Sequence, residues 1–434
     1  MNWRKVIQLT LIHVAVTITV VPVTSTLNRI MIADMQMSAL FVSLLVALPY
    51  LLSPLQVIVG TWADRHAVWG QHRSPWIILG GLMAAFGGYF TAHTVYWMQA
   101  DPVLGLLAAI AAFLVWGVGV NIASVSYLSL VGDLTADAPE WRSRAVSVMW
   151  TGMILFIILT SLLLARLLEP FSEEALYLAF GAVWAAACLF LFAGVAGVER
   201  AAAGRPLQNS ADNPMLAFRL LADNPTARRF FVYLLLVLIA IYAQDVVLEP
   251  YGAEALGMSV GMTARLTSIW GVGLLITLVG GTFLIRRVGK RRAANMGAGA
   301  TALAFLWVIF AGLLQSPALF MGSVLAVGLG AGLLTVASLS LMLDMTAPQA
   351  VGLYMGAWGV ANFVGRALGN ISSGLVRDGV YWLSNNAVAG YMAVFALEAL
   401  SLVLAVWVFR SISVENFRRD AEAQLAHVLA VAAD

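Results

Sequence analysis

The feature that most constrains this chain is a succession of long apolar runs joined by short connections. A helix needs about 20 apolar residues to cross a bilayer, and runs of that length recur twelve times. Backbone groups find no water in the hydrocarbon, so each run is predicted to be helical. The predicted spans are residues 5–27, 38–62, 75–97, 103–131, 141–168, 175–197, 229–250, 260–285, 293–314, 318–343, 349–376 and 388–410.

Composition supports the same conclusion. The 434 residues are 61% hydrophobic and 11% charged, whereas soluble domains carry about 25% charged residues. The first run follows Met1–Lys5 without a small-residue cleavage site, so we expect a retained transmembrane helix. Cys188 is the single cysteine, which excludes an internal disulfide framework and a thiolate metal cluster. The sequence therefore predicts an all-α membrane protein with twelve transmembrane helices.

The distribution of basic residues predicts the orientation. Of the 24 Lys and Arg residues, 19 lie in the terminal segments and in the loops that follow even-numbered spans. Only Arg29, Arg166, Arg265 and Arg377 lie on the opposite side, and Arg366 falls inside a span. Cytoplasmic loops are enriched in Lys and Arg. Both termini are therefore predicted to be cytoplasmic.

Short sequence echoes indicate an internal repeat. Gly60–Arg65 follows the second span, and a similar stretch, Gly281–Arg286, follows the eighth. Asp133–Ala136 follows the fourth span, and Asp344–Ala347 follows the tenth. Two parallel halves related by an axis along the membrane normal describe the major facilitator architecture. The predicted divisions are a six-helix half at 1–198, a cytoplasmic linker with a short amphipathic helix at 199–228, a second six-helix half at 229–411 and a cytoplasmic tail at 412–434.

The loop after the second span resembles the conserved motif that major facilitator proteins carry between their second and third helices. Its residues here are Gly60, Asp64, Arg65, Gly70 and Arg73. We expect a cytoplasmic gate in which Asp64 pairs with a loop arginine or with a helix N-terminus. This motif indicates the fold and says little about the ligand.

The seventh span ends in a polar stretch, Ala243–Gly252, which contains Gln244, Asp245 and Glu249. On a helix, Asp245 and Glu249 share one face, and an acid at the bilayer centre costs roughly 2.5–3.5 kcal/mol. They are either solvated among the lipid headgroups or part of an internal site. Arg366 lies at a similar depth in the eleventh span, so we predict that it pairs with Asp245 or Glu249. That pair would either lock two helices together or bind the polar head of a ligand.

Three further features of the spans carry predictions. Gly365 and Gly369 have the GxxxG spacing that permits close helix approach. His13 lies midway along the first span, where it would hydrogen-bond a neighbouring helix, relay protons or ligate the magnesium of a chlorin. Asn28–Arg29, at the end of that span, is interpreted as an interfacial anchor.

The run Arg228–Gly252 resembles the PucC/LhaA family, also called the bacteriochlorophyll delivery family. The family pattern there is Ala-Gln-Asp, two apolar residues, Leu-Glu-Pro and an aromatic residue, matched here by Ala243–Tyr251. Ser53–Gly60, with Asp64, Gly70, Arg73, Pro75 and Trp76, is also similar to this family. The resemblance extends over essentially the whole chain.

This resemblance implies a factor that assembles light-harvesting or reaction-centre complexes and hands bacteriochlorophyll, as cargo, to antenna polypeptides. It implies partners among antenna polypeptides, the reaction centre or a pigment synthase. The expected location is a bacterial inner membrane, either cytoplasmic or intracytoplasmic and photosynthetic. A cavity between the halves, lined by aromatic residues and glycines with few charges, would suit a large flat apolar ligand.

Two other functional classes stay open. The Gly60–Pro75 segment also resembles that of sucrose and glycoside-cation symporters, in which Asp245 or Glu249 would have to titrate. A pigment-free scaffold for antenna assembly is the third possibility. The sequence shows no P-loop, no nucleotide fingerprint, no metalloenzyme spacing and no nucleic-acid-binding pattern. We therefore expect neither an enzyme nor a nucleotide or free metal as cofactor.

Overall fold

The computed structural model describes residues 2–136, 138–199, 224–345 and 351–412, together with 415 and 417. For residues 57, 64, 139 and 351–357 it describes the backbone only. The predicted amphipathic helix of the linker and most of the predicted tail lie outside the described residues.

The described chain folds into long helices with one isolated β-bridge between Val68 and Gln71. The N-terminal helices are α1 (Trp3–Thr17), α2 (Val20–Pro22), the π-helices η1 (Val23–Leu27) and η2 (Ile30–Asp34), α3 (Ala39–Leu51), α4 (Leu55–Arg65), α5 (Ser74–Ala100), α6 (Pro102–Thr135), α7 (Pro139–Leu167) and α8 (Glu173–Val195). The C-terminal helices are α10 (Pro225–Leu256), α11 (Val260–Val288), α12 (Lys290–Leu313), α13 (Pro317–Asp344), α14 (Val351–Ser384) and α15 (Ala387–Phe409).

Short polar residues set where many helices begin, because their side-chain oxygens accept hydrogen bonds from free backbone N–H groups in the first turn. Side-chain caps of this kind are Asn2 for α1, Ser38 for α3, Asp101 for α6, Ser172 for α8, Asn224 for α10, Ser259 for α11, Ser316 for α13 and Asn386 for α15. Single polar residues between apolar runs therefore fix the ends of the spans.

Ten helical segments in the described residues are long and apolar enough to cross a membrane. The first of them continues through η1 and η2 to Asp34, so it is longer than the predicted span at 5–27. The second predicted span is divided into α3 and α4, with Leu52–Pro54 between them. A proline cannot donate a helical hydrogen bond and disfavours helix in the residue before it.

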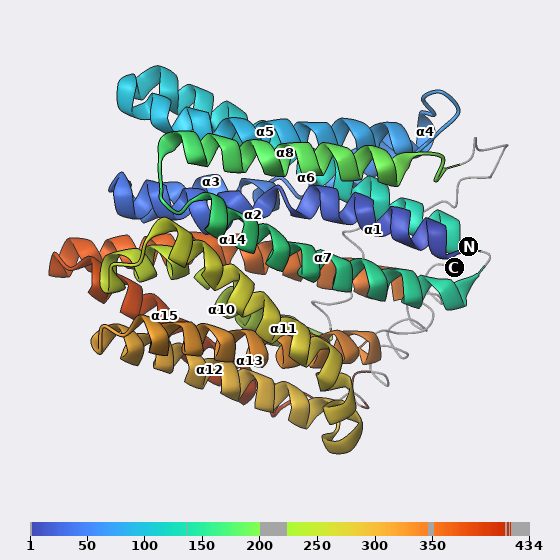
Figure 1. Ribbon diagram of the computed structural model, residues 1–434. Coiled ribbons are helices and arrows are strands. Elements are labelled where there is room, and N and C mark those ends of the chain that lie inside the picture. Colours follow the sequence, from blue (N-terminus) through green and yellow to red (C-terminus); the bar gives the residue numbers. More distant parts are fainter. Residues whose placement is uncertain are drawn as a thin grey trace.

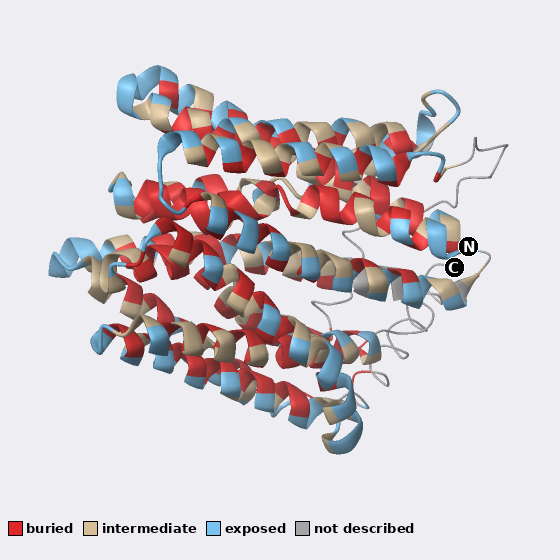
Figure 2. Cartoon of the chain, viewed as in Figure 1, coloured by how far each residue is buried: buried red, intermediate tan, exposed pale blue. Residues whose placement is uncertain are grey.

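The helices gather into two groups. Apart from α3, those from α1 to α8 pack mainly with one another, as do those from α10 to α15. In Figure 1 the first group, in blue and green, lies above the second, in yellow to red. The groups meet where α3 packs on α14 and α7 packs on α11. Figure 2 shows buried residues along the inner helix faces, with exposed residues on the outer faces and at the ends.

Glycines permit the closest packing in the first group, between α5 and α6. A Cβ on Gly87 would lie 2.4 Å from the backbone nitrogen of Trp116. A Cβ on Gly119 would lie 2.4 Å from the backbone nitrogen of Ala84. The two backbones thus touch directly, as in helix pairs joined by small residues within membranes.

We predict that Gly87→Ala destabilises the protein by about 1–3 kcal/mol, because the added methyl group overpacks against the backbone of α6. The matched control is Gly299→Ala in α12, where a Cβ meets no atom within 4 Å. Alanine is the better helix former, so the control should unfold at the same temperature or higher. Thermal unfolding of both variants in detergent measures this. Equal midpoints for the two variants would contradict the packing.

Candidate functional site: an arginine between two tyrosines

The centre of the candidate site is an ion pair between α14 and α10. Arg366 Nη2 lies 3.3 Å from Asp245 Oδ2, which confirms the predicted pairing of Arg366 with one of the two acids. The guanidinium lies between two aromatic rings, 4.5 Å from the centroid of Tyr50 and 4.3 Å from that of Tyr242. Stacking of a guanidinium on aromatic faces is favourable and keeps its plane fixed.

This pair lies at the contact between the two helix groups, because Tyr50 belongs to α3 and Tyr242 to α10. The side chains of Arg366 and Asp245 are 30% and 21% exposed, so neither is fully enclosed. Arg366 Nε has no hydrogen-bond partner among the described residues. A guanidinium carries five N–H donors, and Asp245 takes one of them. The remaining donors can bind a carboxylate or carbonyl oxygen of a ligand.

Glycines bring α14 close enough to α10 for this pairing. A Cβ on Gly365 would lie 2.7 Å from Leu238 Cβ, and one on Gly369 would lie 2.8 Å from the carbonyl oxygen of Ile239. The close approach predicted from the GxxxG spacing is therefore confirmed. Arg366 follows Gly365 directly, so the packing of the helix backbones also sets the position of its side chain.

Glu249 is directed elsewhere. It is buried and accepts a hydrogen bond from Thr267 Oγ1 of α11 at 3.0 Å, one turn further along α10 than Asp245. Gln244 is also buried, and its Oε1 has no hydrogen-bond partner in the described structure. Gln244 and Asp245 point about 100° apart because they are successive residues of a helix. Glu249 lies on a face close to that of Asp245, but one turn along α10, where its neighbour is Thr267 of α11.

Asn28 and Arg29 are not an interfacial anchor, and that interpretation was wrong. Both are buried, and Asn28 Nδ2 donates to the carbonyl oxygens of Asp245 at 3.0 Å and Val246 at 3.3 Å. The first helical segment continues beyond them to Asp34, which places them inside the bundle. Asn28 thus binds the backbone of α10 beside the candidate site.

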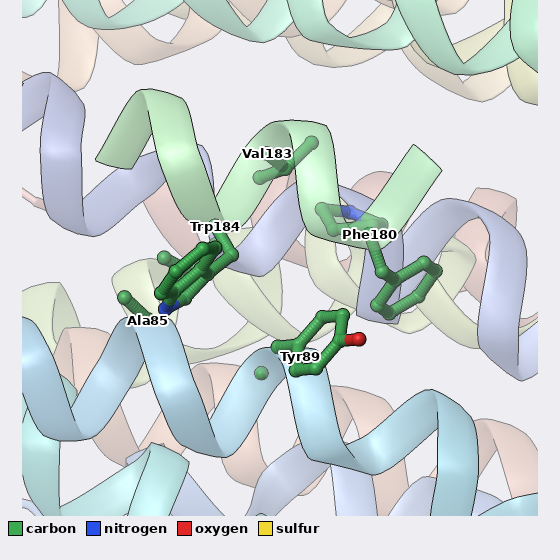
Figure 3. A pocket seen from close by; sticks show the side chains of 8 residues that line it. Ala85, Tyr89, Phe180, Val183 and Trp184 are labelled. Carbon is green, nitrogen blue, oxygen red and sulfur yellow. The ribbon is translucent and has the colours of Figure 1, made fainter. Parts of the chain in front are cut away.

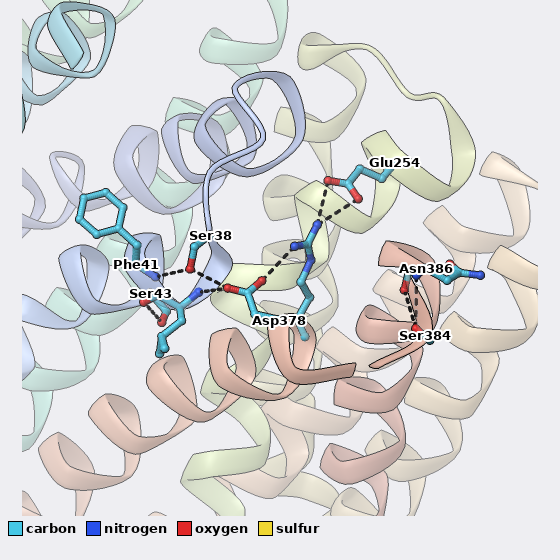
Figure 4. Close-up of polar contacts among 9 residues, drawn as sticks. Ser38, Phe41, Ser43, Glu254, Asp378, Ser384 and Asn386 are labelled. Atoms are coloured by element: carbon cyan, nitrogen blue, oxygen red, sulfur yellow. Dashed lines mark hydrogen bonds and ion pairs between the residues drawn. The ribbon is translucent and has the colours of Figure 1, made fainter. Parts of the chain in front are cut away.

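A second polar network connects the two helix groups at the end of the bundle whose loops contain few arginines (Figure 4). Asp378 of α14 accepts from Ser38 Oγ at 2.7 Å and from the backbone nitrogen of Leu40 at 2.9 Å. Arg377 contacts both Asp378 at 2.9 Å and Glu254 of α10 at 3.3 Å. Arg29, paired with Asp34, donates to the carbonyl oxygen of Met258 at 3.4 Å. These contacts close the bundle at that end.

The sequence carries no prediction for Glu398. Arg377, which the sequence places on the side opposite the termini, is buried in α14. Glu398 lies at the middle of α15, buried, and neither of its carboxyl oxygens has a hydrogen-bond partner in the described part of the chain. A lone acid in an otherwise apolar span was the available signal, since such residues usually mark functional positions.

His13 lies apart from this site, in the first helix group. Its ring centroid is 5.0 Å from that of Tyr127 and 6.2 Å from that of Trp150. Its Nδ1 has no hydrogen-bond partner within the described residues. The side chain is buried between these rings, so no open face for a flat macrocycle adjoins it in this conformation.

Two pockets lie away from the contact between the groups. One, with a cavity volume of about 10 Å³, lies beside Tyr89, Phe180 and Trp184, between α5 and α8 (Figure 3). The other, of about 40 Å³, lies beside Phe230, Arg291 and Phe409. Small-molecule sites usually occupy about 300–1,000 Å³. Neither pocket is therefore the predicted cavity between the halves. Within the described residues no group of three His, Cys, Asp or Glu side chains could hold a metal ion.

The predicted gate residues run from the last turns of α4 to the start of α5, at the end of the bundle whose loops contain many arginines. Gly60 of α4 packs towards Val125, Arg65 is exposed, and Gly70 has a φ of 72°, which glycine adopts without strain. The side chain of Asp64 lies outside the described residues, so its predicted pairing stays a prediction. Arg73 Nε contacts Asp133 Oδ2 at 3.0 Å.

The starts of α5 and α12 are each bound by an acidic side chain at this end of the bundle. Glu199 accepts from the backbone nitrogens of His72, Arg73 and Ser74, so it binds the N-terminus of α5. In the second helix group, Lys290 at the start of α12 contacts Asp344 at 2.7 Å. Asp133 and Asp344 are the two acids of the sequence echo, and each binds a cation at the start of the corresponding helix.

The sequence profile described as "PUCC protein" matches residues 26–417. Protein PucC of Rhodobacter capsulatus is 30% identical over 93% of this chain and 90% of its own length. A protein of the same species named "Bacteriochlorophyll synthase 44.5 kDa chain" is 27% identical over 93% of this chain and 94% of its own length.

Among solved structures, a bacterial homolog of the human lysosomal transporter Spinster, in an inward-facing and unoccupied conformation, has a similar fold. The TM-score is 0.71 at 15% identity, covering 97% of this chain and 99% of that one. The match shows a fold like that of the major facilitator transporters in an all-helical, multi-pass membrane protein.

We predict that the double variant Arg366→Gln/Asp245→Asn loses less stability than the sum of the losses in the single variants Arg366→Gln and Asp245→Asn. Removing one partner of a fully buried pair costs about 3–5 kcal/mol, and partial exposure lowers the expected loss below that range. A double-mutant cycle on thermal unfolding in detergent should give a coupling of about 0.5–3 kcal/mol. Additive losses would mean that the two side chains do not interact.

Proposed function

Because the chain belongs to the PucC family, we propose that it is an assembly factor for photosynthetic light-harvesting and reaction-centre complexes. In this proposal it binds bacteriochlorophyll and delivers it to antenna polypeptides. The family match over residues 26–417 is the main support for the proposal. A relative that matches over nearly its full length and is named a bacteriochlorophyll synthase chain adds to it.

The geometry of the site supports this role. Arg366 has N–H donors besides the one that Asp245 accepts, and its guanidinium lies between Tyr50 and Tyr242 at the contact of two groups of largely apolar helices. A large flat pigment needs apolar and aromatic surroundings for its macrocycle and a few polar groups to orient its carbonyl substituents. We assign Arg366 and Asp245 as the polar part of such a site, with Gln244 and Glu249 on the adjoining faces of α10.

We propose the following topology. The ten long apolar segments, together with the α3–α4 pair and α14, give twelve crossings in two parallel halves. The arginine-rich loops and both termini face the cytoplasm, in a cytoplasmic or intracytoplasmic photosynthetic membrane. The network around Asp378 then closes the outer end of the bundle. Pigment would therefore enter from the inner end or from the lipid.

Delivery requires that the pigment site open and close. The two pockets have cavity volumes of about 10 and 40 Å³, far below the roughly 300 Å³ of an ordinary ligand site. We therefore propose that pigment binding separates the two helix groups around Arg366. His13 remains a candidate ligand for the chlorin magnesium, provided that the ring of Tyr127 or Trp150 moves away from it. Antenna polypeptides, the reaction centre or a pigment synthase are the proposed partners, and the protein itself catalyses no reaction.

We predict that the protein, purified in mild detergent from a native phototrophic membrane, carries bacteriochlorophyll in stoichiometric amount. Absorption spectra and pigment extraction measure the amount bound. Arg366→Gln and Asp245→Asn should lower it, because they remove the polar contacts at the centre. Glu249→Gln and His13→Ala test the other two candidates. Arg286→Gln and Glu174→Gln are matched controls, because both side chains are exposed and should leave the pigment content unchanged.

The other outcomes separate the alternative functions. A colourless protein that still copurifies with antenna polypeptides would be a scaffold for assembly without pigment. A colourless protein without these polypeptides, which takes up protons with a small polar solute in vesicles, would be a symporter. Either result overturns pigment delivery.

A further inference from the structure

Helix α15 packs antiparallel to α10, and aromatic ring contacts at two levels fix the register between them. Tyr233 stacks on Phe409 with ring centroids 4.6 Å apart. Near the other end of α10, Tyr251 lies against Tyr391 and Phe395, with centroids 5.8 and 5.2 Å away. These contacts define one face of each helix.

Gln244 and Glu398 occupy the matching positions between these two aromatic contacts. Gln244 lies eleven residues after Tyr233, and Glu398 lies eleven residues before Phe409. Eleven residues make about three helical turns, so each polar residue lies on the same face as its aromatic neighbour. The antiparallel register therefore brings Gln244 and Glu398 to the same level of the α10–α15 contact.

Both side chains are enclosed. Gln244 is 3% exposed and Glu398 is 2% exposed. Neither carboxyl oxygen of Glu398 nor Oε1 of Gln244 has a hydrogen-bond partner among the residues described. A buried carboxylate without a cation or donor is strongly unfavourable, and such a group binds a proton instead.

No charge on the packed elements compensates an ionised Glu398. On α10, Asp245 is negative and acts on Glu398 repulsively. On α14, Arg366 is already paired with Asp245, while Arg377 and Asp378 bind partners at the arginine-poor end. On α12, the stretch 293–313 contains no acidic or basic residue. Glu249, the next acid of α10, accepts from Thr267 of α11 and would add only negative charge. Tyr251 and Tyr391 are in ring contact at the start of α15 and supply no positive charge.

We propose that Glu398 is a proton-binding residue. Its carboxyl group holds a proton while α10 and α15 are packed together. The protonated carboxyl group then donates a hydrogen bond to the amide oxygen of Gln244, which lies at the same level of α10. The proton leaves only when the α10–α15 contact opens to water. This assignment does not depend on the identity of the cargo.

Infrared spectroscopy of the purified full-length chain at neutral pH tests this proposal. We expect a carboxylic-acid carbonyl band in the wild type that shifts in deuterated water. Glu398→Gln should remove one acid equivalent from this band and leave the carboxylate bands unchanged. Glu249→Gln separates the contribution of the other buried glutamate. Glu174→Gln, an exposed control, should reduce only the carboxylate bands.

The opposite result is equally clear. If Glu398→Gln reduces the carboxylate bands and leaves the acid band intact, Glu398 is ionised and the proposal is wrong. If that variant does not fold, Gln244→Leu decides, because loss of the hydrogen-bond acceptor should shift the acid band. An acid band at the wild-type position in Gln244→Leu would overturn the pairing of the two residues.

Discussion

The constraint on which this structure depends is the cost of an uncompensated charge away from water. The chain meets it in a different way at each buried ionisable group. Arg366 has a carboxylate and two aromatic rings, and Arg377 has two carboxylates. Glu249 has a hydroxyl donor from Thr267. Glu398 has none of these in the described structure, so a bound proton is the way in which it avoids a buried charge.

The contacts between the two helix groups have the character of a separable interface. Asp378 binds Ser38 and the first turn of α3, and Asn28 binds carbonyl oxygens of α10. Such hydrogen bonds can be exchanged for water when the ends of the helices move apart. Close backbone contacts occur inside the groups, as at Gly87 between α5 and α6, and also between them, where a Cβ on Gly374 of α14 would lie 2.6 Å from the carbonyl oxygen of Ala39 in α3. The two groups are therefore held together by small-residue packing as well as by hydrogen bonds.

The features that could be predicted from the sequence are those set by the length of the apolar runs and by the few charges within them. Most helices follow from the apolar runs, and the partner of Arg366 could be predicted because few acids lie at its depth. Depth along a helix does not say which way a side chain points, so Asn28 was misassigned to the interface although it binds α10. Glu398 was missed because one acid barely changes the mean hydropathy of its span, and only tertiary register reveals its position opposite Gln244.

Consecutive residues of α10 belong to two unlike polar sites. Asp245 pairs with Arg366 in a charged, partly exposed site between the helix groups, while Gln244 lies buried at the level of the enclosed Glu398 of α15. Because α10 is one continuous helix, a rotation that widens the Arg366 site also moves Gln244 against α15. One turn of α10 would thus link two events: release of the proton from Glu398 and occupancy of the site between the helix groups. The coupling would need no pathway beyond this turn.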